Sequence, residues 1–218
     1  MSRMGVVEPL RERLVSAGVD MLEEVGAAQL GLRQIARETG VSHGAPRRYF
    51  PTHNTLLAAI AVRGYADLRT RIDAAQDTGR TAEAPGTAVR RCTETIAAQR
   101  ITVREQVERM GLAYVEFAAE RPEMFTLMFR HDLLEGAGGN LRVTTTLPMF
   151  ARWRELIAEC APDRAGARAL NLWTNLHGIA VVVANRSIEA VAPGTDVRAL
   201  VADAVARHLA ADPAGQGV

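Results

Sequence analysis

The sequence predicts an all-α protein. Apolar residues recur at helical spacing along most of the 218 residues, and no segment shows the strict alternation of a half-buried strand. Glycine and proline interrupt these apolar stripes at the intervals expected for helix ends. With 48% hydrophobic residues, the chain can bury a sizeable core. We expect nine helices, and a tenth if the segment 87–99 is helical.

The first fifty residues predict three helices. An apolar stripe over residues 10–25 ends at Gly26. A second, shorter stripe over residues 32–38 ends at Gly40, because glycine reaches the left-handed conformation that closes helices without a steric penalty. A third helix is expected over residues 43–49. Two short helices joined by a turn of this length are typical of a helix-turn-helix.

The second motif helix carries groups that suit DNA. Ser42 is expected to cap it, and the small residues that follow would let its backbone lie deep in the major groove. The adjacent Arg47 and Arg48 can reach a base edge and the phosphate backbone. Residues 31–50 hold four arginines and one glutamate, whereas the whole chain has a net charge of only +1. The candidate DNA-binding residues are Arg33, Ser42, His43, Gly44, Ala45, Arg47, Arg48, Tyr49 and His53.

The rest of the chain predicts a long helix followed by a helical body. An apolar stripe over residues 52–77 leads away from the first three helices. Thr102 and Glu105 have the spacing of a capping box, and the helix that they begin should end near Glu120. Pro122 suits the first position of the next helix. Further helices are expected over residues 141–160, over residues 163–190, and from a cap at Thr195 or Asp196 to about residue 209.

The span from about Leu10 to Ile60 resembles the DNA-binding domain of the TetR family of bacterial regulators. Gly31 departs from the family pattern, since Ser or Thr usually stands there, but glycine is an acceptable cap. Arg47 stands where Tyr is common, and His53 where Lys is common. The resemblance implies a DNA-binding domain over residues 1–51 and a connecting helix over residues 52–78. The matching positions are Ile35-Ala36, Gly40-Val41-Ser42, Gly44-Ala45, Phe50 and Leu56-Leu57.

Residues 121–129, together with Trp173, His177 and Gly178, resemble the ligand-binding domain of one TetR subgroup, which is named for its Trp, His and Gly (WHG). The resemblance implies a helical-bundle ligand-binding and dimerisation domain over residues 79–218. Aromatic and sulfur-containing side chains could line a mostly apolar pocket there. A position in the plain core is the competing interpretation for each of them. The candidate ligand-binding residues are Met110, Tyr114, Phe117, Met128, Phe129, Phe150, Trp153, Trp173 and His177.

The run 179–184 is apolar around the whole circumference of its helix, so it must be covered on more than one side. The last two helices of two copies could cover it by forming a four-helix interface. Full burial within one copy is the competing account. A helix-turn-helix usually reads two half-sites on DNA, which independently favours a homodimer.

Other function classes find little support in the sequence. It has no P-loop, no nucleophile elbow, no zinc-protease motif and no Cys/His cluster, so we expect no enzyme activity, no cofactor and no metal. Its two cysteines, Cys92 and Cys160, are far apart and fit reduced thiols, with a redox-sensing pair as the alternative. The chain has neither an apolar run long enough to span a bilayer nor a signal-peptide pattern at its N-terminus. We therefore expect a cytoplasmic protein without a membrane partner.

These observations together predict a homodimeric transcription regulator. We expect a repressor that binds a palindromic operator in double-stranded DNA through residues 31–53. A small, largely apolar effector that enters the helical body would release it. The alternative is a helical small-molecule-binding or signalling protein whose helix-turn-helix is vestigial.

Overall fold

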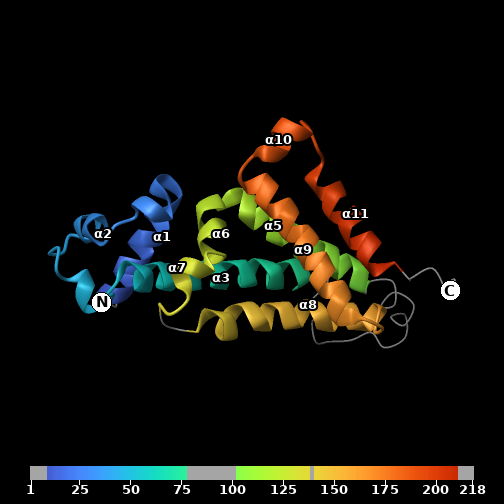
Figure 1. Cartoon of the computed structure of the whole chain (residues 1–218), viewed down its shortest axis with the longest axis horizontal. Helices are drawn as coiled ribbons and strands as arrows, with labels where there is room; N and C mark the ends of the chain where they lie inside the picture. Colours follow the sequence, from blue (N-terminus) through green and yellow to red (C-terminus); the bar gives the residue numbers. More distant parts are fainter. Residues whose placement is uncertain (1–8, 78–101, 138–139, 211–218) are drawn as a thin grey trace, which may run out of the picture. The chain divides into compact units, whose positions relative to one another are not determined.

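The computed structural model of the chain describes residues 9–77, 102–137 and 140–210 (Figure 1). Within these residues the chain forms ten α-helices, one 3₁₀ turn and one π-helical turn, and it forms no strand. The predicted all-α class is therefore confirmed. The predicted helix over residues 87–99 lies outside the described residues. The contacts divide the chain into a first unit, Met1–Ala66 with Arg121–Thr146, and a second unit, Asp67–Glu120 with Leu147–Val218.

The first unit contains a bent first helix and a close helix crossing. Helix α1 changes direction at Gly26, the predicted helix end, whose φ of 70° and ψ of 160° lie in a region that essentially only glycine adopts. A Cβ atom at Gly18 would lie 2.5 Å from Cδ1 of Ile60, so glycine lets α1 and α3 approach closely. The elements of this unit are α1 (Leu10–Gln29), α2 (Leu32–Glu38), η1 (Pro46–Arg48), the start of α3 (His53–Asp77), α6 (Pro122–Met128), α7 (His131–Leu134) and the π-helical η2 (Arg142–Thr146).

The second unit is a bundle in which α5 contacts both α9 and α11. Gly111 of α5 is buried, and a Cβ atom there would lie 3.2 Å from side-chain atoms of Leu176 and Val201. The apolar core of the second unit includes Met110, Tyr114, Phe117, Trp153 and Leu172. The elements are the end of α3, α5 (Val103–Glu120), α8 (Leu147–Cys160), α9 (Ala165–Ala184), α10 (Ser187–Val191) and α11 (Val197–Leu209).

Several predicted helix ends are confirmed. Thr102 and Glu105 form the expected capping box, since the hydroxyl of Thr102 accepts from the amide of Glu105 and the carboxylate of Glu105 accepts from the amide of Thr102. Pro122 is the first residue of α6. Asp196, rather than Thr195, caps the last helix, because its carboxylate accepts from the two amides at 198 and 199.

Two predicted helices are interrupted. The expected helix over residues 163–190 is wrong, because the helix is interrupted between α9 and α10, where Arg186 has a φ of 58°. The Asn185 side chain accepts from the amide of Ser187 there and competes with the backbone ladder. The expected helix over residues 141–160 begins as a π-helical turn before α8. Pro148 explains this change, since it has no amide hydrogen to continue the regular ladder.

Candidate nucleic-acid interface

The turn after α2 forms as predicted. Gly40 has a φ of 68°, and its amide donates to the carbonyl of Arg37 at 3.2 Å. The amide of Val41 donates to the carbonyl of Ala36 at 2.9 Å. These two hydrogen bonds form a Schellman motif, which satisfies carbonyls that the end of a helix would leave open. Gly31 occupies the cap position at the start of α2, as expected.

The predicted helix over residues 43–49 is wrong in its extent. Only residues 46–48 are helical, as the 3₁₀ turn η1, and residues 43–45 form a turn. Pro46 is the physical reason, because it has no amide hydrogen to donate to the carbonyl of Ser42. The amide of Ala45 donates to that carbonyl instead, at 2.9 Å. Ser42 is therefore not the cap of η1, whose cap residue is Ala45.

Buried anchors and two arginines of α1 hold this segment in place. Pro46 and Phe50 are both buried. The guanidinium of Arg11 lies over the ring of Phe50 at 5.4 Å from its centroid, within cation–π range. The guanidinium of Arg13 donates to the carbonyl of Thr39 at 2.7 Å and so satisfies one of the last carbonyls of α2. The backbone between α2 and α3 is thus fixed from its inner side.

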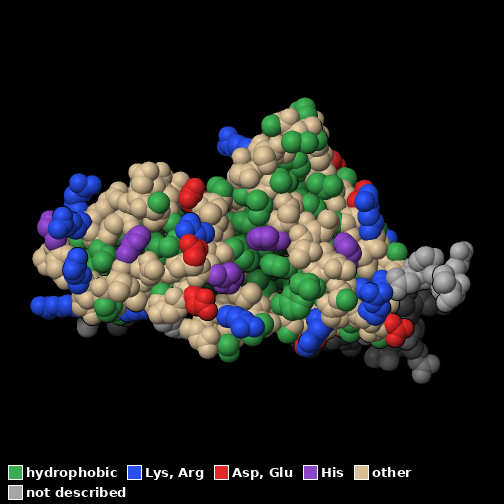
Figure 2. Space-filling model, in the orientation of Figure 1, with side chains coloured by type: hydrophobic (Ala, Val, Ile, Leu, Met, Phe, Trp, Pro, Cys, Tyr) green, Lys and Arg blue, Asp and Glu red, His purple; other side chains and the backbone are tan. Residues whose placement is uncertain are grey.

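Most of the candidate DNA-binding side chains are exposed. Tyr49 has 44% of its surface exposed, although it is a large aromatic residue. Ala45 and His53 are half-buried. Arg37 was not among the candidates, but it is exposed one helical turn after Arg33, and this i, i+4 spacing could have identified it. Figure 2 shows basic side chains gathered over α2 and the turn that follows it. The exposed candidates are Arg33, Ser42, His43, Gly44, Arg47, Arg48 and Tyr49.

His53 has a structural contact that the sequence did not indicate. Its Nε2 atom lies 2.6 Å from the carbonyl oxygen of Leu30. A carbonyl only accepts, so Nε2 carries the hydrogen of this bond. The bond ties the first turn of α3 to the link between α1 and α2. A phosphate contact through Nε2 would require this bond to break, so the predicted DNA contact of His53 has a competitor within the chain.

The candidate ligand-binding residues fall into both units. Met128 and Phe129 belong to α6 and its C-terminal cap in the first unit, and the other seven lie in the second. Phe129, Phe150, Trp173 and His177 are half-buried, and the remaining candidates are buried.

Three of these residues form a polar and aromatic cluster in the second unit. The Tyr114 hydroxyl and Nδ1 of His177 share a hydrogen bond of 2.8 Å. The rings of Trp173 and His177 stack with centroids 5.2 Å apart. Burial lowers the pKa of His177 below its usual value of 6.5, so the neutral imidazole is favoured. Among the described residues, no group of three or more His, Cys, Asp or Glu side chains is placed to hold a metal ion.

The models of two domains of one protein family match the sequence. "Bacterial regulatory proteins, tetR family" matches residues 14–60, which include α2 and η1. "Tetracyclin repressor-like, C-terminal domain" matches residues 107–212, which include α8 to α11. The chain belongs to the TetR family.

The similarity to individual TetR relatives is partial in sequence and extensive in fold. HTH-type transcriptional regulators from Mycobacterium tuberculosis and Mycobacterium bovis are each 37% identical over 70 residues. These residues make up 32% of this chain and 30% of each relative, so the chain matches less than a third of their length.

In the described residues, no helix is both long and apolar enough to cross a membrane.

Solved structures extend the likeness to nearly the whole chain. A protein of unknown function from Rhodococcus sp. RHA1 has a TM-score of 0.72 and 26% identity, covering 95% of this chain and 97% of that one. A TetR-like transcriptional regulator from the same organism has a TM-score of 0.63 and 17% identity, covering 94% of this chain and 98% of that one. At 17% identity, the second likeness concerns the TetR fold alone.

Proposed function

We propose that this chain is a DNA-binding transcription regulator that reads double-stranded DNA with α2, the turn at Gly40 and η1. The observation that carries the proposal is a cluster of exposed arginines on a segment whose backbone is fixed from inside. Within the described part of the chain, no carboxylate pairs with any of them, so their charge is available to phosphates. The four arginines are Arg33, Arg37, Arg47 and Arg48.

The two arginines of the short η1 element can contact different parts of the DNA. In a 3₁₀ turn, consecutive side chains leave the backbone about 120° apart. Arg47 and Arg48 therefore point in different directions, and one can reach a base edge while the other holds a phosphate. Gly44 has open space where a Cβ atom would lie, so the backbone there can approach DNA closely.

We also propose that the regulator is a cytoplasmic homodimer, formed through α9 and α11, that binds a palindromic operator. The support is apolar surface on α9 that the described chain leaves uncovered. Leu170 is 50% exposed, and Val181, within the run that is apolar on all sides, is 39% exposed. A partner copy would bury this surface. We call residues 32–48, from the start of α2 to the end of η1, the reading segment. In the dimer, the reading segment of each copy would meet one half-site.

The cluster of Tyr114, Trp173 and His177 supports a further proposal, namely that the second unit belongs to the WHG subgroup and binds a small, largely apolar effector. The stacked Trp173 and His177 rings offer an apolar surface beside a neutral polar group. Such an effector would act on a repressor by favouring a conformation that no longer fits the operator. Binding of the effector would then release the DNA.

Fluorescence anisotropy tests the DNA-binding proposal. The purified chain should bind its own upstream DNA more tightly than a shuffled sequence of the same composition at moderate salt. Replacing Arg47 and Arg48 together by alanine should cost about 1–3 kcal/mol of binding free energy for each base that an arginine reads. Replacing Arg152 and Arg154, exposed on α8, by alanine is the matched control, since it removes the same charge elsewhere. No preference for the upstream DNA over the shuffled sequence would refute the proposal.

One observation favours the rival function, a helical ligand-binding or signalling protein with a vestigial helix-turn-helix. The expected second motif helix is reduced to the three residues of η1. The same experiment decides between the two. The rival predicts that the double variant at Arg47 and Arg48 and the control variant bind DNA equally weakly.

A further inference from the structure

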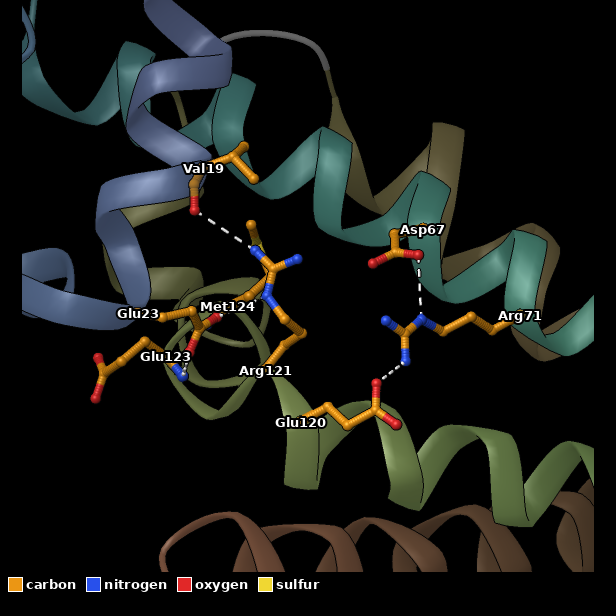
Figure 3. Close-up of polar contacts among 8 residues, drawn as sticks. All are labelled: Val19, Glu23, Asp67, Arg71, Glu120, Arg121, Glu123 and Met124. Carbon is orange, nitrogen blue, oxygen red and sulfur yellow. Dashed lines mark hydrogen bonds and ion pairs between the residues drawn. The ribbon is translucent and has the colours of Figure 1, made fainter. Parts of the chain in front are cut away.

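The N-terminus of helix α6 is hydrogen-bonded to helix α1. The amides of Glu123 and Met124 both donate to the carboxylate of Glu23, each at 3.1 Å, and Pro122 has no amide hydrogen. The guanidinium of Arg121 pairs with the same carboxylate at 3.1 Å (Figure 3). One carboxylate of α1 thus satisfies the amides that the first turn of α6 would leave open.

The other end of α6 is fastened to the first part of α3. The buried hydroxyl of Tyr65 donates to the carbonyl of Met128 at 2.6 Å, and Met128 is the last residue of α6. Gly64 is buried, and a Cβ atom there would lie 2.5 Å from the sulfur of Met124. Helix α6 has only seven residues and so depends on tertiary contacts for its stability. The contacts described above come from α1 and α3, the helices that support the reading segment.

The residue before Arg121 is bound differently. The carboxylate of Glu120, the last residue of α5, pairs with the guanidinium of Arg71 at 2.5 Å. Arg71 also pairs with Asp67 at 3.1 Å, and its guanidinium lies 5.3 Å from the centroid of the Phe117 ring. All four of these residues belong to the second unit. Figure 3 shows Arg71 directed toward both of its carboxylate partners.

We propose that Glu23 is a positioning residue, which holds α6 against α1 and thereby keeps α1 in the position that the DNA-reading segment needs. Because Arg11 and Arg13 of α1 contact Phe50 and Thr39, a loss of this attachment would reach the segment that reads DNA. This last step rests on the proposed function, whereas the attachment of α6 does not.

Amide hydrogen exchange of the full chain, resolved by NMR, tests the attachment without DNA. Glu23→Gln removes the charge and leaves one oxygen to accept where two accept now. Exchange at Glu123 or Met124 should accelerate by about tenfold to a hundredfold, the effect expected when a hydrogen bond to a charged group is removed. Glu120→Gln makes the same chemical change in the second unit and should leave exchange at both amides unchanged.

Two outcomes would overturn the proposal in this experiment. Unchanged exchange at Glu123 and Met124 in the Glu23→Gln variant would show that the carboxylate does not hold α6. Equal acceleration at these amides in the Glu120→Gln variant would show that α6 depends on the second unit as much as on the first. Acceleration of all amides by one common factor would mean global destabilisation, and it would also overturn the specific role of Glu23.

Operator affinity is a second readout, and a purely structural role of Glu23 would leave it unchanged. At a temperature where the circular dichroism of Glu23→Gln equals that of the unmodified chain, operator affinity should fall between about 2-fold and 30-fold. Glu120→Gln should bind as the unmodified chain does. Unchanged operator affinity in Glu23→Gln would overturn the positioning role. If the unmodified chain binds no operator, the proposed function fails, while the exchange experiment still decides whether Glu23 holds α6.

Discussion

Substitution of Gly40 by alanine measures the backbone strain that a residue with a Cβ atom would carry in the turn between α2 and η1. The residue has a φ of 68°, and a Cβ atom there would meet nothing within 4 Å. Steric contact therefore contributes nothing to the cost of the substitution. What remains is the left-handed conformation itself, which costs an L-residue about 1–2 kcal/mol.

The turn could avoid this strain only by giving up its hydrogen bonds. The bonds from Gly40 to Arg37 and from Val41 to Ala36 require the positive φ. Breaking both would cost roughly 1–3 kcal/mol in total, and two carbonyls at the end of α2 would be left without partners. Keeping the turn and accepting the strain is therefore no more costly. We expect Gly40→Ala to lower the free energy of unfolding by about 1–2 kcal/mol, which corresponds to about 2–8 °C in Tm.

Chemical denaturation of Gly40→Ala and Gly44→Ala side by side measures this strain. Gly44 also has open space around a Cβ atom, but its φ is not positive. Alanine there should leave stability unchanged or raise it by about 0.4–1 kcal/mol through the unfolded chain. Equal stability of the two variants would refute the reasoning. A loss well above about 3 kcal/mol in Gly40→Ala would also refute it, because it would indicate a steric contact.

Three further predictions concern the helical framework. Asp196→Ala should lower the free energy of unfolding by about 1 kcal/mol in chemical denaturation, whereas Asp196→Asn, which keeps an acceptor, should have a smaller effect. Tyr65→Phe should lower it by about 1–3 kcal/mol by leaving the carbonyl of Met128 without the hydroxyl, and an unchanged midpoint would contradict this hydrogen bond. Since burial lowers the pKa of His177, the unfolded chain takes up its proton first as pH falls below about 6.5, so Tm should drop between about pH 7 and pH 5. The drop should be smaller in His177→Gln, and an equal drop would show that other groups cause it.

Helix ends were predictable where the signal lies within a few residues. Gly40, the pair Thr102 and Glu105, and Asp196 all act through hydrogen bonds to amides or carbonyls at most five residues away. Local chemistry also accounts for the errors. Pro46 carried a local signal that the helical expectation for residues 43–49 did not take into account.

The contacts that position the candidate site were not predictable in this way. Glu23 and Met124 are separated by 101 residues in the sequence, and His53 and Leu30 by 23. No periodicity or short motif encodes such pairs, because tertiary packing alone brings them together. The exposure of Arg33 and Arg37 was predictable, since a helix of seven residues buries only the face that carries its apolar side chains.

Pro46 has a consequence for how the reading segment can respond to DNA. Many nucleic-acid-binding segments gain helical structure when they bind, and the ordering reduces their affinity. Here the carbonyl of Ser42 can never receive an amide hydrogen from residue 46, whether DNA is present or absent. A helix that begins at His43 would therefore always lack its first hydrogen bond. DNA binding gains nothing from that bond, so its strength depends on the contacts that the exposed side chains of the segment make.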